Sequence, residues 1–243
     1  MKKRKIKTSR LVVLIGFIIL TVSMCVYLIK MSFLFVGDVS LIQPEVKEEK
    51  IACIGDSITY GNGVWQTRES HAWSFLLENM LPKSYTIHNL GISGATLQAE
   101  GNNPYTASEQ WQYAISHPHS IYIVMLGTND TKPINWNEER YAKQLDDMIE
   151  ILLHLEWKPK VIMMLPSRIF INPSTGETVN GMSNDVLVEK VHPIIRKVAK
   201  KHGLKMVDLY AITKDHPEYF EDGVHPGQIG NQKMAECIYE KLQ

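Results

Sequence analysis

Short apolar runs alternate with longer amphipathic stretches from residue 50 to residue 243, and this alternation constrains the fold more than any other feature. Five apolar runs have the length and composition of strands, at residues 51–54, 85–88, 121–126, 161–165 and 205–207. Five stretches with helical periodicity follow them in turn, at residues 71–81, 108–116, 137–155, 184–201 and 228–241. Repeats of this kind favour a parallel sheet covered by helices on both faces. The sequence therefore predicts one α/β domain over residues 50–243, a three-layer α/β/α sandwich with a five-stranded parallel sheet.

The N-terminal segment differs from this domain in charge and hydropathy. Residues 1–30 hold seven basic side chains and no acidic one, and residues 11–29 carry no charge. A helix of this length, at about 1.5 Å per residue, spans roughly 28 Å, close to the hydrocarbon thickness of a bilayer. Basic residues favour the cytoplasmic side of a membrane. We therefore expect a cytoplasmic segment at 1–10, a transmembrane anchor at 11–30, a linker at 31–49 and a catalytic domain outside the plasma membrane.

A cleaved signal peptide is the alternative to an anchor, and it would make the protein secreted. The apolar stretch is longer than the usual 7–15 residues of a signal peptide, and no small-residue cleavage site follows it. Cys25 follows the bulky Met24, which does not fit a lipoprotein signal. The uncleaved anchor is therefore favoured.

The three cysteines and the charge balance exclude other classes of protein. Three cysteines do not make a disulfide framework. Cys53 and Cys237 are expected to be buried as small hydrophobic residues, with a bridge between them left open. No metal-ligand spacing is present, and 26 basic against 26 acidic side chains give no case for a nucleic-acid partner. The sequence carries no indication of an oligomeric state.

Polar clusters follow the predicted strands at the edge where an open parallel sheet binds its ligands. Ser57 follows the first strand, Gly91 the second and Asn129 the third, and Asp222 and His225 come before the last helix. Alone, each has a structural explanation, such as a helix cap for Ser57 or a turn for Gly91. Together they supply the groups needed for acyl transfer through a serine nucleophile.

These clusters resemble the four blocks of the SGNH/GDSL hydrolase superfamily, which centre on Ser, Gly, Asn and His. The matching residues are Gly55-Asp56-Ser57, Gly91, Gly127-Thr128-Asn129-Asp130 and Asp222-Gly223-Val224-His225-Pro226. The resemblance covers about residues 50–240, with Ile58 standing where the name-giving motif has leucine. It implies a flavodoxin-like SGNH hydrolase fold and an esterase activity that needs no cofactor and no metal.

The resemblance also implies a role for each residue. Ser57 is the expected nucleophile, His225 the general base and acid, and Asp222 the group that orients the imidazole. The backbone N–H groups of Ser57 and Gly91 and the side-chain amide of Asn129 are the expected oxyanion donors. Asp56 and Asp130 are expected to order their turns rather than to take part in chemistry.

The loops at the same edge favour a small acyl group carried by a glycan as the substrate. They are polar, contain no long apolar insertion and carry Trp65 and Trp136, whose flat faces suit sugar rings. An anchor that faces the cell envelope fits an envelope glycan. A lysophospholipase or thioesterase, a glycan O-acyltransferase and a catalytically inactive glycan-binding module are the alternatives.

Overall fold

The computed structural model of the protein describes residues 20–28 and residues 49–243. Residues 20–28 are helical with exposed side chains. The predicted segment 1–10, most of the predicted anchor 11–30 and nearly all of the linker 31–49 lie outside the described residues. Within the two described ranges, no helix has both the length and the apolar character required to cross a bilayer. The anchor therefore stays a prediction.

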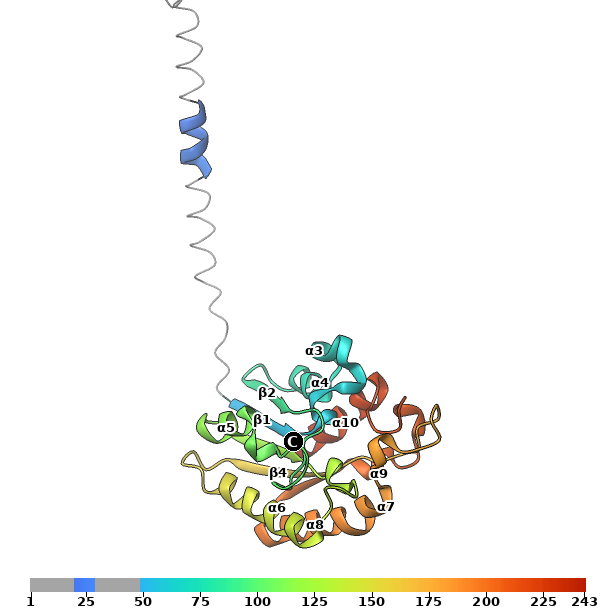
Figure 1. The fold of residues 1–243 in the computed structure, drawn as a ribbon. Helices are drawn as coiled ribbons and strands as arrows, with labels where there is room; N and C mark the ends of the chain where they lie inside the picture. The colour runs from blue at the N-terminus through green and yellow to red at the C-terminus, as the bar shows by residue number, and fades with distance from the viewer. Residues whose placement is uncertain (1–19, 29–48) are drawn as a thin grey trace, which may run out of the picture. The chain divides into compact units, whose positions relative to one another are not determined.

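The described residues from Glu49 onward belong to one compact unit built on a five-stranded sheet. All strands are parallel, in the spatial order β2–β1–β3–β4–β5, which confirms the predicted sheet (Figure 1). The strands are β1 Glu49–Gly55, β2 Tyr85–Gly91, β3 Ile121–Met125, β4 Lys160–Leu165 and β5 Lys205–Asp208. Gly55 at the end of β1 pairs with Gly91 of β2 and with Met125 of β3. The three strands therefore end at the same level, which brings the loops that follow them side by side.

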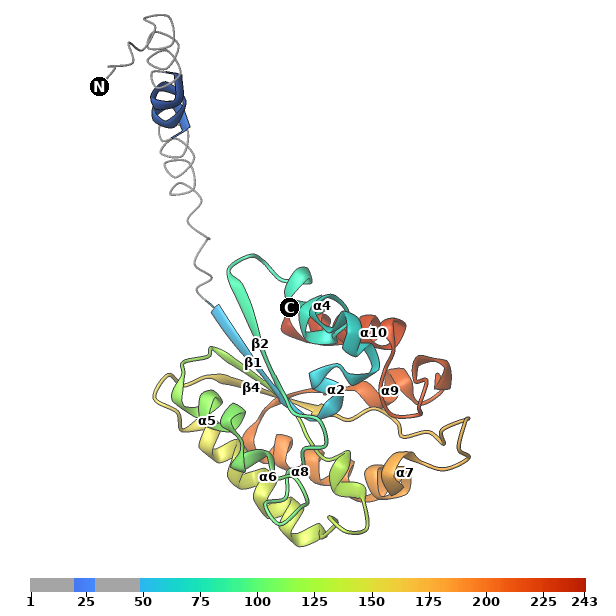
Figure 2. The same ribbon diagram turned by 45° about the horizontal axis from the view of Figure 1, so that its top comes forward.

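Helices cover both faces of the sheet, as the alternation predicts. Helices α4 and α10 lie on one face, and α5, α6 and α8 lie on the other (Figures 1 and 2). Their bounds are α4 Trp73–Met80, α5 Glu109–Ser116, α6 Glu138–Leu153, α8 His192–His202 and α10 Gln228–Leu242. In α6 the Asn137 side chain caps the first turn by accepting the N–H of Arg140 at 3.0 Å. Apolar residues at helical spacing on α6 are buried against the sheet, which anchors the helix there.

The predicted helix 184–201 is confirmed as one continuous helical stretch, although its hydrogen-bonding pattern changes along its length. The structure divides it into α7 Asn184–Val186, a π-helical turn Leu187–Val191 and α8. Pro193 lies in the first turn of α8 and has no N–H to donate to an earlier carbonyl group. Because a π turn shifts the hydrogen-bonding partners by one residue, it accommodates this missing donor. The predicted helix 71–81 begins at Trp73 as α4, after the short α3 Arg68–His71.

The cysteines are free in the structure. Cys53 on β1 is fully buried and Cys237 on α10 is partly buried, and no disulfide joins them. Burial raises the pKa of both thiols, so both stay protonated at neutral pH.

Asp130 has the structural role that the sequence predicts for it. Its buried carboxylate accepts the backbone N–H groups of Leu97 and Gln98, each at 2.9 Å. These bonds join the loop after β3 to the loop after β2, and they satisfy two donors that would otherwise be buried without partners. Asp130 therefore fixes the relative positions of two loops at the edge of the sheet that carries the polar clusters.

Candidate active site

A tight strand-to-helix turn presents Ser57 at the carboxyl end of β1. The strand ends at Gly55, and the one-turn helix α2 Ser57–Tyr60 begins two residues later. The buried Asp56 caps this helix by accepting the N–H of Ile58 at 2.9 Å. A Cβ atom at Gly55 would lie 2.9 Å from the carbonyl oxygen of Met125, closer than Cβ atoms normally approach. Only glycine therefore lets the chain turn this sharply beside β3.

Ser57, His225 and Asp222 form a continuous chain of hydrogen bonds. The Nε2 atom of His225 is 2.8 Å from the Oγ atom of Ser57, and its Nδ1 atom is 2.6 Å from Oδ2 of Asp222. An ionised carboxylate only accepts hydrogen bonds, so the proton of the neutral imidazole resides on Nδ1. Nε2 is then free to accept the hydroxyl proton of Ser57. The structure thus brings together the three residues that the sequence assigns to catalysis.

Asp222 is held in its ionised form. Burial by itself raises the pKa of Asp222, but hydrogen bonds from the His225 side chain and from the backbone N–H groups of His225 and Val224 lower it to about 2. Those backbone bonds to Oδ1 measure 2.8 and 2.9 Å. The carboxylate is therefore charged at neutral pH, as it must be to stabilise the imidazolium that forms when His225 takes a proton.

The loop after β4 holds the turn between Asp222 and His225. Gly223 adopts a positive φ of 88°, and its carbonyl group accepts the N–H of Phe170 at 2.8 Å. A side chain on Gly223 would collide with the carbonyl group of Phe170. The turn from Asp222 to His225 is therefore held in place by a segment that contributes no side chain to the hydrogen bonds between Ser57, His225 and Asp222.

Gly91 lies where the sequence predicts an oxyanion donor, but its N–H is already engaged. It donates to the Oδ1 atom of Asn89 at 3.0 Å. The Asn89 amide is fixed from its other side, because its Nδ2 donates to the carbonyl group of Thr59 and to Ser74. A Cβ atom at Gly91 would lie 2.8 Å from the Cα atom of Tyr60, so the glycine allows β2 and α2 to touch. The N–H of Gly91 would have to exchange Asn89 for a substrate oxygen in order to act as a donor.

Asn129 presents an unsatisfied donor in the interior of the site. It begins the 3-10 turn Asn129–Thr131 after β3 and is buried. Its Oδ1 atom accepts a hydrogen bond from Nζ of Lys132 at 2.9 Å, and its carbonyl group accepts one from Nδ2 of Asn135 at 2.9 Å. Its own Nδ2 is buried and has no partner among the described residues. An unpaired buried amide is costly in the resting protein, so this donor is suited to a negative oxygen that appears during a reaction.

A cavity of about 720 Å³ opens beside His225. Asp222 and His225 form part of its wall, with Trp65 and Tyr219 among the other lining residues. Trp65 is 69% exposed, so its indole face is available for contact with a ligand. Trp136 lies elsewhere: it packs against the core, with its ring 5.5 Å from that of Tyr141. Of the two tryptophans that the sequence singles out, the structure places only Trp65 in the wall of this cavity.

Residues 53–233 match the model of the GDSL-like lipase/acylhydrolase family. The chain belongs to this family. This match confirms the family that the four blocks of the sequence predict.

Individual relatives of the GDSL domain include one curated protein and several solved structures. An acetylxylan esterase from Xylanibacter ruminicola is 32% identical over 216 residues, which are 80% of this chain and 44% of that esterase. The chain thus spans less than half the length of this relative. A putative arylesterase from Agrobacterium tumefaciens has a TM-score of 0.68 at 22% identity, covering 80% of this chain and 98% of its own. A carbohydrate acetylesterase family member from Sinorhizobium meliloti has a TM-score of 0.65 at 16% identity, covering 80% and 97%. The two structures share the fold of this GDSL domain.

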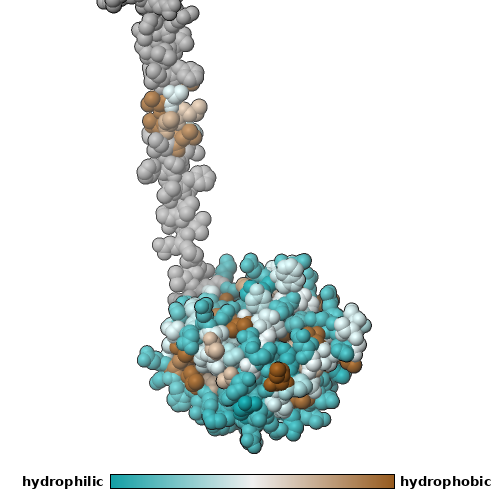
Figure 3. Space-filling view, in the orientation of Figure 1, coloured by the Kyte–Doolittle hydropathy of each residue, from teal (hydrophilic) through white to brown (hydrophobic). Residues whose placement is uncertain are grey.

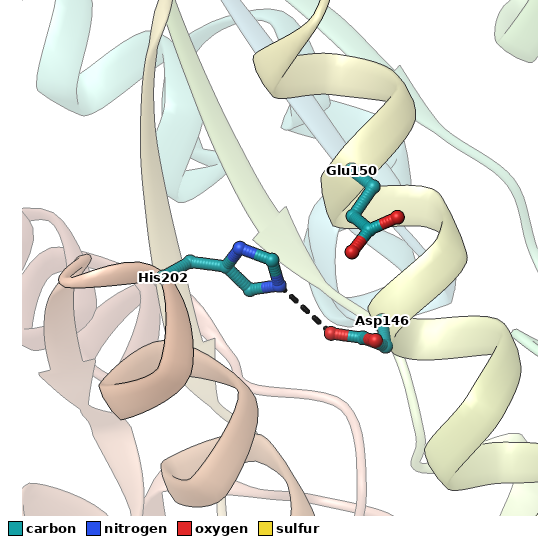
Figure 4. A group of neighbouring side chains, drawn as sticks. All are labelled: Asp146, Glu150 and His202. Carbon is teal, nitrogen blue, oxygen red and sulfur yellow. Dashed lines mark hydrogen bonds and ion pairs between the residues drawn. The ribbon is translucent and has the colours of Figure 1, made fainter.

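A cluster of ligand-type side chains outside the GDSL blocks joins α6 to α8. Asp146 and Glu150 on α6 face His202 at the end of α8 (Figure 4). The Nε2 atom of His202 is 2.7 Å from Asp146, and Nζ of Lys201 lies 2.6 Å from Asp146 and 3.2 Å from Glu150. The ammonium group of Lys201 occupies the position between the two carboxylates that a cation would need. The cluster is therefore an ion-pair network that links α6 to α8.

Sequence reasoning missed three residues that shape the GDSL site. These are Asn89, Lys132 and Asn135, whose side chains bind the predicted oxyanion donors Gly91 and Asn129. All three lie within six residues of the donor that they contact, and proximity to a block was the one signal that the sequence offered.

The ionised state of Asp222 leads to a prediction on pH dependence. Hydrolysis of p-nitrophenyl acetate requires a charged Asp222 beside the imidazole of His225. Because the pKa of Asp222 is about 2, this carboxylate is already charged above pH 4, and the acid limb of the plot of kcat/KM against pH should have a slope of one. Asp222→Asn should lower kcat by roughly 1,000-fold or more, because a neutral amide does not stabilise the imidazolium.

The control for this prediction is Asp215→Asn, which changes an exposed aspartate near the same loop and should leave kcat within about twofold. Steady-state rates between pH 4 and pH 8 provide the measurement. An acid limb with a slope of two, or an Asp222→Asn variant with wild-type turnover, would contradict the assigned role of Asp222.

Proposed function

We propose that the domain is a serine esterase that removes an acetyl or another small acyl group from a glycan by a Ser-His-Asp mechanism. The observation that carries the proposal is the chain of hydrogen bonds from Ser57 through His225 to Asp222. Nucleophile, base and orienting carboxylate lie within hydrogen-bonding distance of one another before a substrate arrives.

In the first half-reaction, the Oγ atom of Ser57 attacks the ester carbonyl carbon while Nε2 of His225 takes the hydroxyl proton. The carbonyl oxygen becomes an oxyanion and accepts hydrogen bonds from Nδ2 of Asn129 and from backbone N–H groups. As the tetrahedral intermediate collapses, the bond to the alcohol breaks and Nε2–H of His225 gives the alcohol its proton. The products are a free hydroxyl group and an acyl ester on Ser57.

In the second half-reaction, water takes the place of the alcohol. His225 accepts a proton from the water as its oxygen attacks the acyl carbonyl carbon. Collapse of this second intermediate breaks the bond to Oγ, and the proton on Nε2 returns to Ser57. The carboxylic acid leaves, and the resting enzyme is restored.

The position of the cavity supports a sugar as the alcohol part of the substrate. His225 must reach the leaving oxygen to protonate it, so the leaving group lies on the His225 side of Ser57. The cavity that includes His225 is on that side and exposes the indole of Trp65. A flat aromatic face next to hydrogen-bonding side chains such as Gln66 and Gln228 suits a sugar ring.

The charge of the cavity favours a glycan over a phospholipid. Its lining residues include the carboxylates of Glu218, Glu221 and Asp222 and contain no lysine or arginine. A phosphate headgroup would meet only like charge there, which is unfavourable in a partly desolvated site. The face of the domain drawn in Figure 3 is mostly hydrophilic, with apolar residues scattered over it. The name of the acetylxylan esterase relative agrees with a glycan-borne acyl group.

Two substrate series test this proposal. Turnover of p-nitrophenyl esters should be highest with acetate and should fall by about tenfold or more at an eight-carbon acyl chain. Trp65→Ala should raise KM for an acetylated xylo-oligosaccharide by roughly tenfold, because the sugar loses its stacking face, and should leave kcat for p-nitrophenyl acetate within about twofold.

The matched control is Ile151→Ala, which removes an exposed apolar side chain from α6 and should change neither constant. A preference for acyl chains of eight carbons or more would overturn the small-acyl assignment in favour of a lipid substrate. An unchanged KM for the oligosaccharide in Trp65→Ala would contradict the proposal that the sugar binds in this cavity.

The proposed location of the enzyme follows from its N-terminal sequence. We propose that residues 11–30 anchor it in the plasma membrane with the domain outside, because residues 11–29 are uncharged and a basic segment precedes them. In fractionated cells, the full-length protein should stay in the membrane pellet after a carbonate wash. Recovery of a shortened protein in the medium would instead indicate signal-peptide cleavage.

A further inference from the structure

Lys132 is a buried cation that the esterase mechanism above does not use. It follows the 3-10 turn Asn129–Thr131, and its side chain and backbone together are only 8% exposed. Lysine is rarely buried to this extent without a partner that offsets the loss of hydration. Burial lowers the pKa of Lys132, whereas the nearby carboxylates of Asp56 and Asp130 raise it.

The hydrogen bond of Lys132 determines which way the Asn129 amide faces. An ammonium group has three donors and no acceptor, so the Asn129 atom that lies 2.9 Å from Nζ must be the oxygen. The NH₂ group of Asn129 therefore points away from Lys132. It has no partner of its own among the described residues. If the amide rotated by half a turn, its NH₂ would face a cation and its oxygen would occupy the donor position.

The rest of the turn is fixed as well, so Lys132 acts on an amide with little freedom. The backbone carbonyl group of Asn129 accepts a hydrogen bond from Nδ2 of Asn135 at 2.9 Å, and Oδ1 of Asn135 accepts one from the backbone N–H of Asn102 at 3.0 Å. The positive charge of Lys132 next to the amide oxygen also draws electron density from the NH₂ group of Asn129. This makes the NH₂ group a stronger hydrogen-bond donor. In a site with little water, such polarisation along a chain of hydrogen bonds is larger than it would be in solution.

We propose that Lys132 is a positioning residue of the esterase, which holds the Asn129 amide with its NH₂ group toward the oxyanion and strengthens that donor with its charge. This inference deepens the proposed function and rests on it. Because the oxyanion exists chiefly in the transition state, Lys132 should affect turnover more than substrate binding. A lysine that only neutralised Asp56 and Asp130 would instead affect stability.

Kinetics of the full-length protein with p-nitrophenyl acetate test the proposal. Lys132→Met keeps most of the apolar stem of the side chain without its charge and donors, and it should lower kcat by roughly 10- to 100-fold with KM changed by less than about threefold. Lys132→Arg, which keeps a charged donor, should recover at least part of that loss. Lys143→Met on α6, where the lysine is exposed and paired with Asp147, is the matched control and should retain wild-type turnover.

A double-mutant cycle separates positioning from a structural role. In an Asn129→Ala background there is no amide to orient, so Lys132→Met should change kcat by less than about twofold. An equal loss of kcat in both backgrounds would overturn the proposal, because Lys132 would then act without Asn129. Lys132→Gln repeats the same cycle with a neutral donor in case Lys132→Met does not fold, as judged by thermal unfolding.

Failure of the proposed function gives a different result. If the esterase assignment is wrong, the wild-type protein does not hydrolyse the ester or Ser57→Ala retains the activity. If only the Lys132 proposal is wrong, the wild-type protein is active, Ser57→Ala is inactive and the cycle is additive.

Discussion

The close packing of the turn from β1 into α2, residues 55–60, against the ends of β2 and β3 is the constraint on which the rest of the site depends. Gly55 and Gly91 are level in the sheet, and a Cβ atom at either position would collide with the backbone of a neighbouring segment. Without side chains at these points, the turn that carries Ser57 sits directly against both neighbouring strand ends. This contact brings the loops after β1, β2 and β3 close enough to act on a single substrate carbonyl group.

The polar groups of the site are oriented by charged side chains that are buried or partly buried. Asp222 is ionised and fixes the imidazole of His225, while Lys132 fixes the amide of Asn129. Removing the charged groups of Asp222 and Lys132 from water is unfavourable. Folding compensates for this free energy before the reaction begins. The cavity on the His225 side has a polar, acidic wall and an exposed indole, and the proposed mechanism would place the leaving alcohol there.

The sequence predicted the fold and the principal residues because both follow from local patterns. Apolar runs of strand length gave the five-stranded parallel sheet, and the edge where parallel strands end gave Ser57, Asn129, Asp222 and His225 as neighbours. Features that depend on the directions of individual side chains were not predictable in the same way. The engagement of Gly91 by Asn89 and of Asn129 by Lys132 depends on side-chain directions that no periodicity encodes. Trp136 illustrates the same limit, since residue type alone does not distinguish a sugar platform from a packing residue.

Covalent labelling is the sharpest test of the proposal that Ser57 is a nucleophile activated by His225. The protein would be treated with a fluorophosphonate, which reacts with activated serines, and the labelled peptide identified by mass spectrometry. We expect one label for each chain, on Ser57, and a reaction slower by about 100-fold or more in His225→Ala, because an unassisted serine hydroxyl is a weak nucleophile. Labelling of a different serine, or an unchanged rate in His225→Ala, would contradict it.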